Sequence, residues 1–100
     1  MFKQKEPRQI ANMVLEYISA FLNSEGGSIY LGVDDDSFVR GLDVSQKWID
    51  QLLLAIDNDG KIQLSPPLIP QKYQIKVIPV KNKKLWLNVI EIKVFPQNNN

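Results

Sequence analysis

The chain has 100 residues, which is enough for one hydrophobic core and too few for two. Hydrophobic residues make up 44% of it and charged residues 23%, as in ordinary folded domains, so we expect one domain over 1–100 with flexible ends at 1–7 and 96–100. The sequence contains no cysteine and no histidine, which excludes disulfides, thiol nucleophiles and imidazole metal ligands. Any catalysis would depend on carboxylates, amines, hydroxyls or bound metal.

No apolar run approaches the roughly twenty residues that a membrane span needs. Residues 1–9 are too polar for a secretory signal. We therefore expect an intracellular, cytoplasmic protein with no membrane partner.

The net charge of +1 conceals an uneven distribution along the chain. Residues 1–60 hold five basic and ten acidic side chains, whereas residues 61–100 hold seven lysines and a single acid, Glu91. This split predicts an acidic edge and a basic face, and a basic face could meet a phosphate backbone. Lysines that only solubilise exposed strands and protect sheet edges would produce the same pattern.

A helix is predicted over residues 8–24, because apolar side chains recur there at helical spacing and Pro7 suits a first turn. Gly26 and Gly27 follow it, and we expect positive φ at both to end the helix and reverse the chain. Residues 28–33 are β-branched and aromatic in character and predict a buried strand. A second short strand at 38–40 would pair with it in a hairpin.

The turn of this hairpin is formed by Asp34, Asp35 and Asp36. Aspartate is common in turns because its side chain bonds to the nearby backbone, so a solvated turn is one interpretation. Carboxylates held at the exit of a hydrophobic strand are also where binding and catalytic residues are often placed. Both interpretations remain open from the residues alone.

The second half of the chain predicts one helix and two strands. Asp43 or Ser45 can cap a helix that extends to Asp57, where residues 58–60 would break it. Residues 65–70 contain three prolines and form an ordered connection. Strands at 72–80 and 85–95 flank a polar turn at 81–84, and the second is apolar on both faces, as in a central strand. The expected fold is α+β, with a small, mostly antiparallel sheet covered by two helices.

The central stretch resembles the Schlafen family, specifically its AlbA-like domain. The likeness is carried by residues 19–27, SAFLNSEGG, by residues 29–35, IYLGVDD, and by Gly41. Residues 70–80 resemble the Schlafen-like subgroup. The resemblance implies an AlbA-like lobe that binds nucleic acid, within a metal-dependent endoribonuclease that acts on tRNA or on small-RNA precursors. It also implies association with another Schlafen-like subunit, as a homo- or hetero-oligomer, because Schlafen cores contain two related lobes.

The same resemblance assigns the catalytic aspartate to Asp35, which would also bind Mg²⁺ or Mn²⁺ with Asp34 as a second ligand. The family places two glutamates just upstream of a Phe-Lys pair, and Phe2-Lys3 matches that pair. Met1 then occupies the position of one glutamate, and the other would precede the chain. We expect either a fragment or a short natural subunit. Glu6, Glu16 and Glu25 are possible substitutes for these glutamates. Solvated helix residues are an equally good interpretation of Glu16 and Glu25.

Three functional hypotheses follow. The first is an RNA-binding subunit that is inactive alone, with folded or double-stranded RNA bound through a set of lysines: Lys72, Lys76, Lys81, Lys83 and Lys84. The second is a nuclease, active alone or as a homodimer, that uses Asp35 and an unexpected glutamate. The third is a protein-interaction module that docks through apolar residues near Trp48 or Trp86, although two tryptophans in so small a domain are expected in the core.

Overall fold

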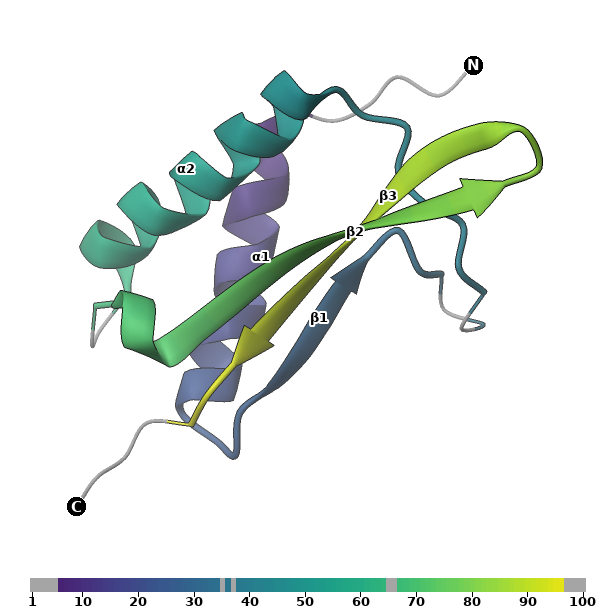
Figure 1. Ribbon diagram of the computed structural model, residues 1–100. Helices are drawn as coiled ribbons and strands as arrows, with labels where there is room; N and C mark the ends of the chain where they lie inside the picture. Colours follow the sequence, from purple (N-terminus) through teal and green to yellow (C-terminus); the bar gives the residue numbers. More distant parts are fainter. Residues whose placement is uncertain (1–5, 35, 37, 65–66, 97–100) are drawn as a thin grey trace.

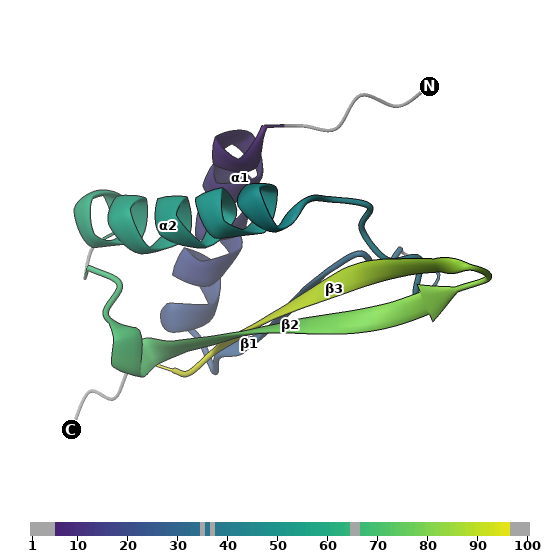
Figure 2. The ribbon, with the colours of Figure 1, turned by 45° about the horizontal axis from the view of Figure 1, so that its top comes forward.

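The computed structural model describes residues 6–34, 36, 38–64 and 67–96. Within these residues it contains two α-helices, α1 (Pro7–Leu22) and α2 (Gln46–Gln63), and a 3-10 helix, η1 (Pro70–Lys72). The strands β1 (Gly27–Leu31), β2 (Tyr73–Asn82) and β3 (Leu85–Val94) form an antiparallel sheet in the order β1-β3-β2. Both helices lie on one face of this sheet (Figures 1 and 2), so the predicted α+β fold with a central last strand is confirmed.

Helix α1 begins at Pro7, as predicted, and the side-chain oxygen of Gln9 accepts a hydrogen bond from the Glu6 N–H at 3.3 Å. The helix ends at Leu22, and Gly26 then takes a φ of +81° while its N–H donates to the Phe21 carbonyl at 3.0 Å. The positive φ expected at Gly27 is wrong. Gly27 is the first residue of β1, and a side chain there would overlap the Phe21 ring, so close packing requires this glycine.

Helix α2 begins at the predicted cap, where the Ser45 hydroxyl accepts from the Trp48 N–H at 3.1 Å. The predicted break at 58–60 is wrong, because the helix continues to Gln63. Gly60 is buried within it, and a Cβ at that position would lie 2.8 Å from the Leu68 side chain. The Leu68 N–H also donates to the Gly60 carbonyl at 3.0 Å. Gly60 therefore leaves space for the Leu68 side chain in the connection after the helix, and it does not end the helix.

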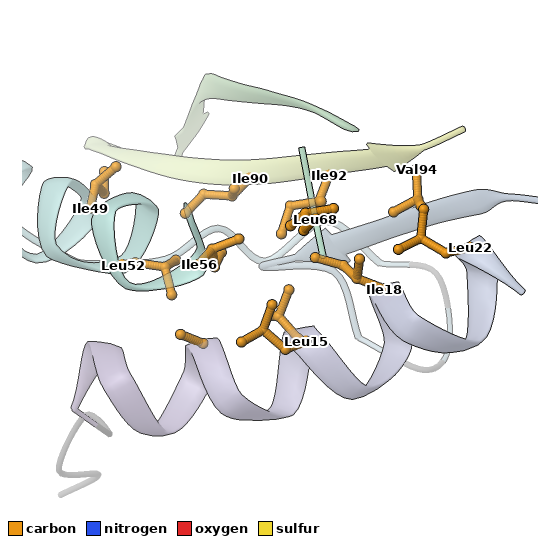
Figure 3. Packing of buried hydrophobic residues seen from close by; sticks show 12 residues of the cluster. Leu15, Ile18, Leu22, Ile49, Leu52, Ile56, Leu68, Ile90, Ile92 and Val94 are labelled. Atoms are coloured by element: carbon orange, nitrogen blue, oxygen red, sulfur yellow. The ribbon is translucent and has the colours of Figure 1, made fainter. Parts of the chain in front are cut away.

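The core lies between the helix pair and the inner face of the sheet (Figure 3). Buried side chains meet there from α1 (Leu15, Ile18, Leu22), α2 (Ile49, Leu52, Ile56), β3 (Ile90, Ile92, Val94) and the connection (Leu68). A fully buried side chain of this type contributes about 1.5–3 kcal/mol. This one cluster holds β3 against both helices, and β3 in turn positions the two edge strands.

A polar contact joins β2 to α2. The Tyr73 hydroxyl donates to Asp57 Oδ1 at 3.0 Å, and Asp57 also pairs with Lys61 at 3.3 Å. Burial of the hydroxyl and its bond to Asp57 raise the pKa of Tyr73 to about 12. The contact fixes the start of β2 beneath the helix, at the end of the sheet where η1 lies.

The predicted strand at 38–40 is reduced to a single bridge between Val33 and Val39. The Arg40 and Gly41 N–H groups both donate to the Gly32 carbonyl at 2.9 Å, and Leu42 then pairs with Asn88 of β3. Leu42 thus continues the edge begun by β1, and the described residues within 33–40 form a loop between the two parts of that edge. We call residues 33–40 the acidic loop.

The β2–β3 hairpin extends farther than expected, because β2 continues to Asn82 and the turn contains only residues 83 and 84. Figures 1 and 2 show this hairpin projecting beyond the ends of both helices. We call residues 81–86 the hairpin tip. The acidic loop and the hairpin tip lie at the same end of the sheet (Figure 1), and the Asn82 side chain donates to the Arg40 carbonyl at 3.5 Å. The predicted flexible ends fall mostly outside the described residues, although Pro7 is buried in α1.

Candidate nucleic-acid interface

The hairpin tip brings three of the five predicted lysines together. Lys81 pairs across the hairpin with Trp86, and Lys83 and Lys84 form the turn. All three lysines are exposed. Within the part of the chain that the structure describes, the ion pairs involve Arg8, Arg40 and Lys61, and none involves a lysine of the tip. The tip is therefore a cluster of positive charge without internal neutralisation.

The other two predicted lysines lie away from this cluster. Lys76 lies on β2 opposite Glu91, on the outer face of the sheet, which is the face away from the helices. Lys72 ends η1, eleven positions before Lys83, which corresponds to roughly 36 Å along an extended strand. The lysines thus follow β2 from one end of the sheet to the other, and only the tip concentrates them.

Trp86 is exposed, so the expectation that both tryptophans are core residues is wrong for this one. Its exposed fraction is 68%, whereas Trp48 is half-buried and packs against the core. Trp86 has the same strand parity as the core residues Ile90 and Ile92, but the helices stop before the end of the hairpin (Figure 2). The lysine-rich run immediately before Trp86 is the sequence signal that could have placed it at a solvated strand end.

In the acidic loop, Asp34 has its carboxylate bound to the loop itself. Asp34 Oδ1 accepts from the backbone N–H groups of Asp36 at 3.1 Å and Phe38 at 3.0 Å, and Oδ2 accepts from Arg40 Nε at 2.8 Å. The Arg40 guanidinium, aided by these backbone donors, holds the pKa of the Asp34 carboxyl below its ordinary value. Asp34 therefore closes the loop: its bonds to the backbone agree with the turn interpretation, whereas its pair with Arg40 was not predicted.

The chain matches the model of the family described as Schlafen, AlbA_2, over residues 2–100. The protein belongs to this Schlafen family. The match covers nearly the whole chain and confirms the resemblance carried by residues 19–35. Membership indicates a nucleic-acid-binding domain, which makes the positive hairpin tip the candidate contact for phosphates.

The Schlafen assignment leaves the predicted metal site untested. Asp35, the predicted catalytic residue, lies outside the described residues. Among the described residues no three acidic side chains gather where they could hold a cation, and the Asp34 oxygens already accept three hydrogen bonds. Glu16 and Glu25 are exposed, and Glu6 lies at the start of α1. Mg²⁺ and Mn²⁺ require several oxygen ligands, so the described carboxylates of this Schlafen lobe do not fit such an ion by themselves.

The outer face of the sheet carries an apolar depression beside the acidic loop. It is lined by residues from the loop and all three strands: Tyr30, Val33, Val39, Ile78, Val80 and Val89. Several of these side chains are exposed although they are apolar. No helix in the described part of this Schlafen chain is long and apolar enough to cross a membrane.

Proposed function

We propose that this chain is an RNA-binding subunit or fragment of a Schlafen-like metal-dependent endoribonuclease, one that processes tRNA or small-RNA precursors and is inactive alone. The observation that carries the proposal is the exposed lysine cluster of the hairpin tip in a domain of a nucleic-acid-binding family. Lysine ammonium groups bind phosphates as point charges, which gives affinity without sequence readout.

In this proposal Lys81, Lys83 and Lys84 contact one part of a folded or double-stranded RNA. Lys76 and Lys72 would contact backbone farther along β2, at a distance that a folded RNA can span. RNA helices are recognised mainly by shape and by their phosphates and 2′-hydroxyls, which suits a projecting basic hairpin. The acidic loop lies at the same end of the sheet, near the RNA that the tip holds.

Asp35 is proposed as this chain's contribution to catalysis. In this proposal, carboxylates from upstream residues or from a partner subunit complete a site for Mg²⁺ or Mn²⁺ that includes Asp35, because the described carboxylates do not gather three ligands by themselves. We derive no catalytic step through the ion. The requirement for added carboxylates is the reason that we expect the 100-residue chain to be inactive alone.

The proposal includes association with a second Schlafen-like lobe, either a copy of this chain or a different subunit. The apolar depression on the outer face supports association, because exposed apolar surface beside polar residues is typical of protein interfaces. The same observation favours the second candidate function, a protein-interaction module that binds no RNA.

The first test measures binding of a fluorescently labelled tRNA by anisotropy over a series of salt concentrations. Replacing Lys81, Lys83 and Lys84 together with alanine should weaken binding and make the slope of log K against log[salt] shallower by about 2. The control replaces Arg8, Lys47 and Lys61, three exposed cations of the helices, which changes the net charge equally. Equal losses in the two variants, or no binding by the parent chain, would refute the proposal.

The second test measures tRNA cleavage in Mn²⁺ or Mg²⁺ by this chain alone and by the chain extended upstream through any native glutamates. We expect cleavage only when the additional carboxylates are present, and its loss on Asp35→Ala. Cleavage by the 100-residue chain alone would instead favour the active homodimer.

A further inference from the structure

Trp86 exposes a large aromatic surface that the fold does not use. It follows Leu85, which pairs with Asn82 next to the turn, and it lies opposite Lys81. Its exposed fraction is 68%. Buried aromatic rings stabilise cores, but this ring is mostly exposed, and its hairpin extends past both helices (Figure 2). An exposed tryptophan in a strongly polar turn region therefore indicates contact with a ligand.

The charges around Trp86 indicate what kind of ligand it is. The Lys81 Nζ lies 5.9 Å from the centre of the Trp86 ring, and Lys83 and Lys84 form the turn that joins the two strands. Leu85, beside the tryptophan, is also exposed. A ligand that fits this surface has a flat aromatic group for the ring and negative charges for the neighbouring lysines, which is the chemistry of a nucleotide.

The backbone conformation of the turn supports a binding role for its lysines. Lys83 has a φ of +57°, in the left-handed region that disfavours side chains with a Cβ. Two-residue hairpin turns usually place glycine, asparagine or aspartate where φ is positive. A lysine at this position carries a conformational cost, and a phosphate contact would account for its presence.

We propose that Trp86 is a stacking platform for an unpaired nucleobase and that Lys81, Lys83 and Lys84 bind the phosphates that flank that base. This inference rests on the proposed function and specifies its substrate class. Bases in an uninterrupted duplex stack on one another, whereas a loop, bulge or overhang offers a base with a free face. The preferred ligand is therefore a folded RNA with unpaired nucleotides at the tip, bound with little dependence on base identity, because every base has a π-face.

Phe38 provides a matched comparison within the molecule. It is also exposed, and the Arg40 guanidinium lies 5.7 Å from the centre of its ring. Arg40, however, is paired with Asp34 at 2.8 Å, and Asp36 lies in the same loop. These carboxylates repel a phosphate. The geometry thus assigns base stacking to Trp86 and not to Phe38.

The test compares two fluorescein-labelled RNA probes by anisotropy at about 50 mM salt, where phosphate contacts are strong. One probe is a single-stranded oligouridine of twelve nucleotides, and the other is a blunt twelve-base-pair RNA duplex. Stacking of one base accounts for roughly 5- to 150-fold in affinity, so Trp86→Ala should weaken binding of the single strand about tenfold. Binding of the duplex should change less than about twofold, because no base stacks on the ring in that complex.

Two further variants test whether the aromatic ring of Trp86 is responsible for the affinity for the single strand. Trp86→Phe keeps an aromatic face and should retain most of the affinity for the single strand, and Phe38→Ala should leave it unchanged. In a Trp48→Phe background, the remaining tryptophan emission reports Trp86 alone, and it should be quenched when the single strand binds. Because Trp86 is exposed, the thermal unfolding of Trp86→Ala should stay close to that of the parent chain.

Several results would overturn the inference. Equal weakening for both probes would mean that Trp86 acts through the structure of the hairpin. Unchanged single-strand affinity in Trp86→Ala, together with a loss in the triple lysine variant, would leave RNA binding intact and remove the stacking role. A change in sedimentation without a change in RNA affinity would make Trp86 a protein contact. Failure of the parent chain to bind either probe would refute the proposed function as well.

Discussion

The acidic loop and the hairpin tip lie at the same end of the sheet, and each presents an exposed aromatic ring beside a cation. The ring and cation are Phe38 and Arg40 in the loop, 5.7 Å apart, and Trp86 and Lys81 in the tip, 5.9 Å apart. The two regions differ in the other contacts of the cation. Arg40 is bound to Asp34, which also accepts from two backbone N–H groups, whereas the charge of Lys81 is reinforced by Lys83 and Lys84.

This difference separates a structural use of charge from a use in binding. In the loop, the carboxylate and the guanidinium satisfy each other and close the chain on itself. At the tip, three like charges stand together in a two-residue turn and its flanking strand, and they repel one another. An aromatic–cation pair therefore does not identify a binding site by itself, and the charges of its neighbours decide.

The largest effect is expected at the base of the acidic loop, for Gly41→Ala. Gly41 has a φ of +80°, and a Cβ there would lie 2.6 Å from the Leu87 Cβ and 3.1 Å from a Val80 methyl group. The left-handed backbone costs a residue with a Cβ about 1–2 kcal/mol, and overpacking costs about 1–3 kcal/mol more. Urea denaturation should show a loss of about 3 kcal/mol, whereas the tip of the folded protein should keep its RNA affinity.

Gly32→Ala is the matched control for this variant. Gly32 has a φ of +97°, but the nearest atom to its Cβ would be the Asn88 carbonyl oxygen at 3.1 Å. The backbone cost is similar and the crowding is smaller, so Gly32→Ala should destabilise the protein by about 1 kcal/mol less. Equal effects of the two substitutions would show that crowding against Leu87 contributes nothing.

The fold was predictable because local patterns and core packing agree. Helical periodicity placed α1 and α2, and a strand that is apolar on both faces placed β3 at the centre of the sheet. Two of the errors fell on glycines, because a glycine in a sequence does not show whether it supplies a positive φ or space for a neighbour. Gly27 and Gly60 supply space, for Phe21 and Leu68, and neither ends a helix in the described structure.

The candidate site was predictable only in part. The lysine run at 81–84 was visible as local charge, and the family match confirms the Schlafen resemblance, which indicates nucleic-acid binding. The pairing of Asp34 with Arg40 was not visible in the sequence, because it depends on how the loop closes. The exposure of Trp86 was missed because it depends on where two distant helices end relative to the hairpin. Sequence periodicity predicts which face of a strand is apolar, but it does not show how much of that face the helices cover.

Lys83→Gly at the tip should have a smaller effect: it should raise the stability of the protein and weaken its binding to RNA. Glycine relieves the left-handed φ of +57° but has more freedom in the unfolded chain, so the net gain in stability should be about 0.5–1 kcal/mol. Loss of one phosphate contact should make the salt slope of RNA binding shallower by about 0.7–0.9. Thermal unfolding and an anisotropy salt series measure the two effects.

The control for Lys83→Gly is Lys84→Gly, which removes the same charge at a position without positive φ. It should weaken RNA binding similarly but lower stability, because glycine adds entropy to the unfolded chain without relieving strain. A gain in stability from both substitutions would mean that charge repulsion, and not backbone conformation, limits the stability of the tip.

The smallest effect is expected for Asp34→Asn, and it tests whether the acidic loop differs from the tip only through this carboxylate. The folded-state pKa of Asp34 is lowered from its ordinary value of 3.8. Its contribution to stability is therefore fully present above about pH 4 and is lost as the pH falls through the folded-state pKa. The difference in free energy of unfolding between the parent and Asp34→Asn should be constant from pH 5 to pH 7 and should shrink as the pH falls further.

The same variant changes the charge that faces RNA. Without the carboxylate, Arg40 is released beside Phe38, so the loop acquires the aromatic ring and unneutralised cation that distinguish the tip. Affinity for a single-stranded RNA at low salt should rise about twofold, since one repelling charge is removed and one attracting charge is freed. Phe38→Ala added to Asp34→Asn should then reduce that gain, although Phe38→Ala alone has no effect. A fall in affinity on Asp34→Asn would show instead that closure of the loop itself is needed for binding.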